Sequence, residues 1–180
     1  KSVTGGFENR SEHLLRKMLS LEEPIVTPKM ADFLMEDGNC DLLLSFVTRV
    51  GGGSRPTLDD THGDEELRLS YRTTALLSAE NASDALQSFL NKSMENIIRI
   101  IFDDVFRFDS AGSFYHAYRV VEGCLRLNPV LVYRALLNDG KMKSRLYSLV
   151  QYIGESPVPE LIVMLLWLSP VPRNSPLFHE

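Results

Sequence analysis

The stretch from Ser113 to Leu168 constrains the fold most, because apolar residues at helical spacing alternate there with residues that end helices. Its first part carries apolar residues at steps of three and four, which places them on one face of a helix. These residues are Phe114, Ala117, Tyr118, Val121 and Leu125. A neighbouring face carries Tyr115, Arg119, Glu122 and Arg126. The spacing therefore predicts a helix with one buried side and one polar side.

A second helix is predicted to begin at Pro129. The residue before a proline is disfavoured in a helix, and the fixed φ of proline suits the first helical position, so Asn128 is expected to be the N-cap. Gly140 can adopt the left-handed conformation that ends a helix. The side chains expected to be buried are Val130, Leu131, Leu136 and Leu137.

Two further helices complete this stretch. One is predicted from Lys141 to Ile153 and ends at Gly154. The other follows Ser156 as the N-cap, with Pro157 at the first helical position. The first is expected to bury Met142, Leu146, Leu149, Val150 and Ile153, and to expose Lys141, Lys143 and Arg145. The second is expected to bury Leu161, Ile162, Leu165, Leu166 and Leu168.

The first half of the chain shows the same succession of helical patterns and capping residues. Thr27 followed by Pro28 is a natural helix start, and other serine and asparagine side chains are also suited to cap helices. Helices are predicted to begin near Ser11, Thr27, Asn39, Glu65, Ser83 and Ser93. The helix from Glu65 to Ser78 is expected to bury Leu67, Tyr71, Thr74 and Leu77.

Residues 51–64 are the clearest interruption of these patterns. The segment begins with three glycines and has almost nothing to bury, which predicts a flexible loop. The helical patterns on its two sides are alike, so we interpret it as an insertion in a single helical-repeat domain spanning 1–180. No stretch alternates apolar and polar residues at period two for long enough to predict a strand. We expect an all-α fold of stacked antiparallel helical hairpins.

Composition and charge exclude several classes of function. A net charge of −5, without any run of more than two basic residues, argues against nucleic-acid binding. The longest apolar run, Leu161 to Leu168, has eight residues, whereas a membrane span needs about 20. Because Cys40 and Cys124 lie within apolar helical patterns, we expect two reduced thiols and a cytoplasmic or nuclear location. The chain starts at Lys1, so we expect a fragment of a longer protein.

Residue types needed for catalysis are sparse. The histidines His13, His62, His116 and His179 show no spacing typical of metal ligands. His116 and Cys124 lie eight positions apart, a rise of roughly 12 Å along a helix, which is too far for a thiol and its base. The adjacent Asp103 and Asp104 are interpreted as solvated or capping charges. We therefore expect no catalytic residue, no metal, no cofactor and no small-molecule substrate, and the chain is not predicted to be an enzyme.

The polar side of the helix beginning at Ser113 is the candidate binding site for a protein partner. It carries Tyr115, Arg119, Glu122 and Arg126. Tyrosine and arginine are enriched at binding hot spots, and two arginines seven positions apart suit an acidic partner. The alternative is that these residues are merely the solvated side that every surface helix has.

One segment of the chain is similar to a known sequence motif. Tyr152 to Ile162 reads Tyr-Ile-Gly-Glu-Ser-Pro-Val-Pro-Glu-Leu-Ile, which is similar to His-Ile-Gly-Thr-Ser followed by an acidic residue and an apolar helix. The matching positions are Ile153, Gly154, Ser156, Leu161 and, by charge, Glu160. Weaker matches are Asp32-Phe33-Leu34, Tyr71 to Ser78, and Ser113-Phe114-Tyr115 with Arg119-Val120. On these residues the chain resembles the SAPS-domain family, the regulatory subunits of protein phosphatase 6 and its fungal counterpart.

The resemblance covers roughly residues 12 to 168 and implies a fold and a role. The implied fold is a HEAT/armadillo-like helical scaffold. The implied role is to bind the catalytic subunit of a serine/threonine protein phosphatase and direct it to substrates, without catalysis by the scaffold itself. The alternative is a helical-repeat interaction module of another intracellular assembly, in transport or trafficking.

Overall fold

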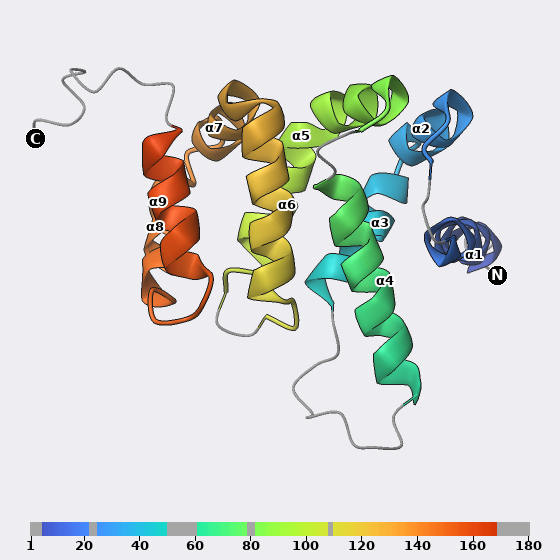
Figure 1. The fold of residues 1–180 in the computed structure, drawn as a ribbon, viewed down its shortest axis with the longest axis horizontal. Helices are drawn as coiled ribbons and strands as arrows, with labels where there is room; N and C mark the ends of the chain where they lie inside the picture. The colour runs from blue at the N-terminus through green and yellow to red at the C-terminus, as the bar shows by residue number, and fades with distance from the viewer. Residues whose placement is uncertain (1–4, 22–24, 50–60, 79–81, 108–109, 169–180) are drawn as a thin grey trace, which may run out of the picture.

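The computed structural model describes residues 5–21, 25–49, 61–78, 82–107 and 110–168, with the backbone alone at 5–9 and 61–64. Within these ranges the chain forms helices and no strand, which confirms the all-α prediction (Figure 1). The helices are α1 (Gly5–Ser20), α2 (Pro28–Met35), α3 (Asn39–Thr48), α4 (Thr61–Leu77), α5 (Asp84–Asp104), α6 (Phe114–Leu127), α7 (Pro129–Leu137), α8 (Met142–Gln151) and α9 (Val158–Trp167). Of the predicted flexible loop at 51–64, residues 51–60 lie outside the described part, and 61–64 belong to α4.

Four predicted helix starts are confirmed by a capping hydrogen bond. In each case a side-chain oxygen accepts from the backbone N–H three residues later, which satisfies a donor that has no partner within the helix. The capping residues are Thr27, Ser83, Ser113 and Asn128. Gly140 has a φ of 70°, the left-handed conformation predicted after α7.

Asn39 and Ser156 do not cap helices as predicted. Asn39 is the first residue of α3, after Gly38 with a φ of 83°. Its amide instead donates to the carbonyl oxygen of Phe33 at 2.8 Å, which ties the start of α3 to the end of α2. At α9 the cap position is Pro157, and no side chain caps the helix.

The predicted helix start at Ser93 is wrong. Asp84 to Asp104 is one helix of 21 residues, α5, and Ser93 lies inside it. Neither proline nor glycine occurs between these ends, so no residue interrupts the backbone hydrogen bonds. A serine with capping potential therefore stays within the helix and is half-buried there.

The buried faces of several helices are rotated from those predicted. On α4, Leu67 and Tyr71 are exposed, and the buried face is Leu69, Ser70, Thr73, Thr74, Leu76 and Leu77. On the later helices the exposed residues that we expected to be buried are Val130, Leu137, Val150, Ile153, Leu166 and Leu168. These helices carry apolar residues on more than one side, so the positions of neighbouring helices decide which side is covered.

Arg145 was expected in solvent, but it is only 3% exposed. Its guanidinium group donates to both carboxylate oxygens of Asp103 (2.8 and 3.0 Å) and of Asp139 (2.9 and 2.7 Å). It also donates to the carbonyl oxygen of Ala135 at 3.3 Å. Asp103 is therefore an ion-pair partner rather than a solvated charge. The planar group pairs with two carboxylates at once and joins α5, α7 and α8.

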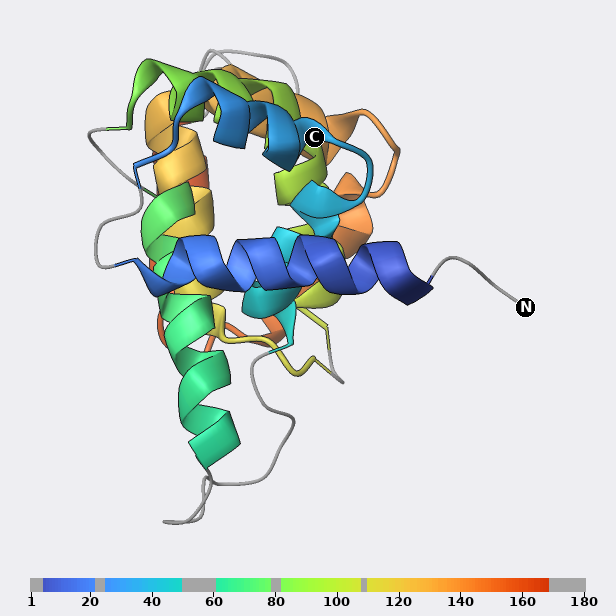
Figure 2. The same cartoon turned by 90° about the vertical axis from the view of Figure 1, so that its right-hand side faces the viewer.

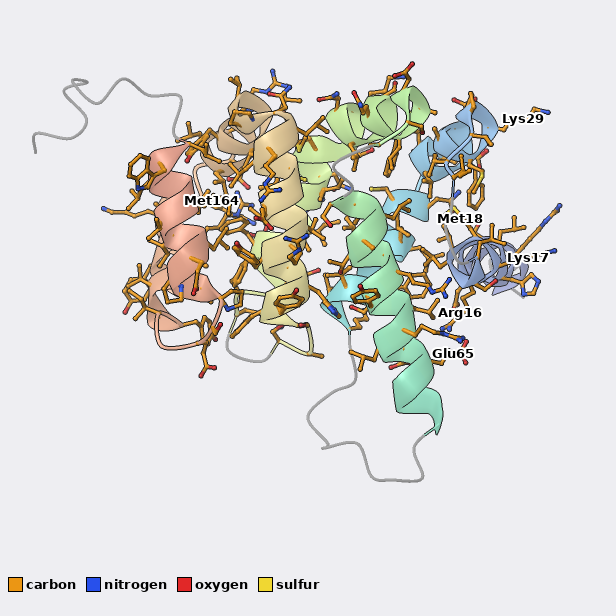
Figure 3. All side chains as sticks on the ribbon, in the orientation of Figure 1. Arg16, Lys17, Met18, Lys29, Glu65 and Met164 are labelled. Carbon is orange, nitrogen blue, oxygen red and sulfur yellow. The ribbon has the colours of Figure 1, made fainter. Side chains whose placement is uncertain are left out.

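Helices α4, α6 and α9 lie side by side in one row, and all three run in the same direction (Figure 1). Helix α5 contacts both α2 and α7, and these three helices form a second row. Seen along the long axis of the molecule, α1 crosses the end of the structure below α2 (Figure 2). An ion pair between Arg16 of α1 and Glu65 of α4, at 3.4 Å, helps to hold α1 there (Figure 3).

Candidate protein-binding site

Helix α6 occupies the middle of the row formed by α4, α6 and α9. It contacts α4 and α9 within the row and also packs on α5 and α7. The residues that this packing buries include Ala117, Val120, Val121, Cys124 and Leu125. Only a narrow strip of α6 remains accessible, and the predicted binding residues lie on it or at its edge.

The four predicted binding residues differ in exposure. Tyr115 and Arg126 are exposed and Arg119 is half-buried. Glu122 is only 6% exposed, so the predicted polar side of this helix is not open to solvent at this residue. The reason is that the Glu122 carboxylate is held between the two arginine side chains.

Arg119, Glu122 and Arg126 form what we call the α6 ion cluster. Arg119 Nη1 donates to Glu122 Oε2 at 2.5 Å, and Arg126 Nη2 donates to Glu122 Oε1 at 2.7 Å. A buried carboxylate is stable only with such partners, because burial removes its hydration. The cluster carries one net positive charge, and both arginines are pre-oriented on the surface of α6.

The α6 ion cluster extends towards α9 through Tyr118. Burial raises the pKa of the Tyr118 phenol, and the carboxylates of Glu122 and Glu160 raise it further. Arg119 and Arg126 act in the opposite direction. Glu160 lies in the first turn of α9. An acidic group of α9 is therefore within electrostatic range of the same tyrosine as the cluster on α6.

A hydrogen bond between Ser70 and His116 joins α4 to α6. Ser70 Oγ and His116 Nδ1 lie 2.6 Å apart, and both residues are buried. Burial lowers the pKa of His116, which favours the neutral imidazole. Sequence reasoning missed this pair because 46 positions separate the two residues. The only local signal was that Ser70 lies at helical spacing from Leu67 and Thr74, on the predicted buried side of its helix.

Two exposed tyrosines lie beside His116. The ring of Tyr71 on α4 is 6.5 Å from the imidazole, centroid to centroid, in an edge-on arrangement. The ring of Tyr115 on α6 lies at 5.9 Å. Both tyrosines therefore flank the same histidine, Tyr71 from α4 and Tyr115 from α6. We call Tyr71 and Tyr115 the tyrosine pair.

Ser70 and His116 do not have the geometry of a catalytic pair. A nucleophilic serine needs a base and also access to its substrate. Ser70 is 0% exposed, and within the described residues no carboxylate contacts His116 to orient it. The hydrogen bond therefore serves to connect α4 and α6.

The cysteines are both free, which confirms the prediction of two unpaired thiols. Burial raises the pKa of Cys40 to about 11 and that of Cys124 to about 12. At neutral pH both are therefore protonated and weakly nucleophilic. His116 makes its hydrogen bond with Ser70 and not with Cys124.

The described residues contain neither a metal site nor a membrane-spanning helix. There, no group of three or more His, Cys, Asp or Glu side chains is placed to hold a metal ion. His13 is exposed, and the side chains of His62 and His179 lie outside the described part. None of the described helices combines the length and the apolarity needed to cross a membrane.

Comparison of the chain with models of protein families, with curated proteins and with solved structures gave no match.

Proposed function

We propose that this chain is a non-catalytic scaffold that binds another protein through the row of α4, α6 and α9. The observation that carries the proposal is the tyrosine pair next to the α6 ion cluster. Tyr71 is 62% exposed and Tyr115 is 56% exposed, although both are large aromatic residues. Tyrosine loses little conformational freedom for the area it buries, and tyrosine and arginine are both enriched at binding hot spots.

The proposed architecture is a HEAT/armadillo-like stack of helical units. The segments α2–α4, α5–α6 and α7–α9 would be the units, because each places its last helix in the row of α4, α6 and α9. The contacts of α2 with α5, and of α5 with α7, favour the same division. In a stack of this kind, equivalent helices line one extended face, which suits the binding of a large partner.

The proposed partner is the catalytic subunit of a serine/threonine protein phosphatase of the phosphatase 6 type. The support is the resemblance of Tyr152 to Ile162 to the SAPS-domain motif. This segment connects α8 to α9, and the ring of Tyr152 packs on that of Phe114, with centroids 4.9 Å apart. Phe114 is the first residue of α6, so the resembling segment contacts the helix that carries the candidate site.

Two further points belong to this proposal. The scaffold would not itself catalyse a reaction, since the Ser70–His116 pair is closed to substrates. The protein would act in the cytoplasm or the nucleus, where thiols such as those of Cys40 and Cys124 remain reduced.

Affinity purification followed by mass spectrometry tests the proposal. The bait is the chain itself, compared with a Tyr71→Ala/Tyr115→Ala variant and with Tyr147→Ala, which alters an exposed tyrosine of α8 outside the row. We expect the unaltered chain and Tyr147→Ala to recover a metallophosphatase catalytic subunit, and the double variant to lose it. Recovery of transport or trafficking proteins instead would favour the alternative assignment, and recovery of no partner would contradict both.

A further inference from the structure

A second candidate surface lies on α9, apart from the tyrosine pair. A shallow groove of about 390 Å³ is lined by Pro159, Glu160, Val163, Met164 and Trp167. Trp167 is 71% exposed, and Val163 is more than half exposed. Met164 lies on the side of α9 that faces α6 (Figure 3). The groove therefore combines an exposed indole ring with aliphatic side chains in the last helix of the row.

Among the residues that the structure describes, Glu160 is the only charged one that lines this groove. Its carboxylate makes no hydrogen bond or ion pair within the described part of the chain, and its influence on Tyr118 is electrostatic only. Glu160 and Trp167 are seven positions apart on one helix, a rise of roughly 10 Å. The groove thus has an unneutralised carboxylate at one end, an indole ring at the other, and aliphatic side chains between them.

We propose that the α9 groove binds a segment of a partner protein that carries an arginine or lysine beside an apolar residue. The cationic head pairs with Glu160, and its aliphatic stem lies along Val163 and Met164. The apolar neighbour packs against the indole of Trp167. An acidic segment is disfavoured, because the groove lining offers it no cation and Glu160 repels it. The inference rests on the proposed role as a protein-binding scaffold and adds the chemistry of one contact.

Trp167 makes a direct test possible, because it is the only tryptophan in the chain. Its fluorescence is titrated with the blocked pentapeptide Ala-Leu-Arg-Leu-Ala and with matched peptides that carry Gln or Glu in place of Arg. We expect the Arg peptide to bind up to about fivefold tighter than the Gln peptide, as for a partly exposed ion pair, and the Glu peptide to bind most weakly. Equal affinities for the three peptides would overturn the proposal.

Variants of the chain locate the effect. Glu160→Gln should abolish the preference for the Arg peptide, and Glu160→Arg should reverse it in favour of the Glu peptide. Glu155→Gln removes an exposed carboxylate outside the groove and should leave the preference unchanged. If Glu155→Gln abolished the preference and Glu160→Gln did not, the assignment to the groove would be wrong.

Other occupants give different results. A change of Trp167 emission on concentrating the protein alone would show that a second copy covers the groove. Binding of the Arg peptide only after deletion of residues 169–180 would show that the chain covers the groove itself. Either result overturns the proposal. If the peptides show no preference while Tyr71→Ala/Tyr115→Ala still abolishes capture of the phosphatase, the groove proposal is wrong and the proposed phosphatase function stands. If the Arg peptide is preferred but no phosphatase is captured, the proposed phosphatase function is wrong and the groove proposal stands.

Discussion

Gly123 of α6 lies directly against Ser78, the residue that follows α4. A Cβ added at Gly123 would lie 2.6 Å from the Ser78 Cα and 3.3 Å from the carbonyl oxygen of Leu77. Non-bonded carbon atoms are in favourable contact only at about 3.5–4.0 Å. The missing side chain therefore allows α4 and α6 to pack as neighbours, which brings Tyr71 and Tyr115 to the same histidine, His116.

Replacing Gly123 with alanine should destabilise the fold. In an exposed helix the same change would stabilise by about 1 kcal/mol, but here the new methyl group forces two backbones apart. We expect a net loss of about 1–3 kcal/mol in the free energy of unfolding, as measured by urea denaturation. Gly154→Ala is the matched control, because nothing lies within 4 Å of a Cβ at that position. A Gly123→Ala protein as stable as the parent would contradict this account of the contact.

Local signals predicted the helix starts well, and long-range contacts account for what they missed. Thr27, Ser83, Ser113 and Asn128 cap helices through bonds within three residues, which a sequence pattern can reveal. Arg145, in contrast, is buried because Asp103, 42 positions away, pairs with it. A charged residue in a helical pattern normally indicates a solvated side, and nothing near Arg145 in the sequence signals its distant partner.

The candidate site was predicted only in part, because the rest of it also depends on long-range contacts. Tyr115, Arg119, Glu122 and Arg126 were singled out by helical spacing, but spacing does not show that Glu122 is buried. Tyr71 was expected in the core, because an aromatic residue at helical spacing usually packs there. Its place against His116 of α6 depends on how α4 and α6 are rotated against each other, which only the packed structure establishes.

Removing Arg145 should destabilise the protein more than removing a neighbouring surface charge. Arg145→Met leaves the carboxylates of Asp103 and Asp139 and the carbonyl of Ala135 without their common donor. We expect the free energy of unfolding to fall by about 2–3 kcal/mol. This is at or below the lower end of the range for broken buried ion pairs, because both carboxylates are partly exposed. Lys143→Met on the exposed side of α8 should change the free energy of unfolding by less than about 0.5 kcal/mol. Similar losses for the two variants would show that the ion pairs of Arg145 contribute little.

Acidification should weaken the fold in two separate pH ranges. Burial lowers the pKa of His116 from its usual value of 6.5, so the unfolded chain takes up the proton first, and stability falls as the pH drops below 6.5. The Arg145 hydrogen bond lowers the pKa of Asp103, so its contribution is lost only as the pH falls below 3.8.

Urea denaturation between pH 7.5 and pH 5 isolates the effect of His116. The transition midpoint of the unaltered chain should decrease over this range, and His116→Gln should remove most of the decrease. His13→Gln, which replaces an exposed histidine, should behave like the unaltered chain. If the transition midpoint decreased equally in the unaltered chain and in His116→Gln, the assignment of this pH dependence to His116 would be wrong.

The thiols should be unreactive in the folded protein. With pKa values of about 11 for Cys40 and about 12 for Cys124, little thiolate is present at pH 8. We expect Ellman's reagent to modify Cys124 only after unfolding and Cys40 much more slowly than a free cysteine in solution. Measurements on Cys40→Ser and Cys124→Ser separate the two. Rapid modification of Cys124 in the native protein would show that its burial is overestimated.

The proposed binding of a phosphatase catalytic subunit by the row of α4, α6 and α9 depends on the tyrosine pair. Its most direct test is the dissociation constant of the purified chain with a purified phosphatase 6 catalytic subunit, measured by calorimetry. The Tyr71→Ala/Tyr115→Ala variant should raise this constant by at least about 30-fold, as expected for the loss of a binding hot spot of 2 kcal/mol. Tyr147→Ala should leave it unchanged, and both variants should retain the helical circular dichroism of the parent. Absence of binding by the parent chain, or equal binding by the folded double variant, would contradict the claim.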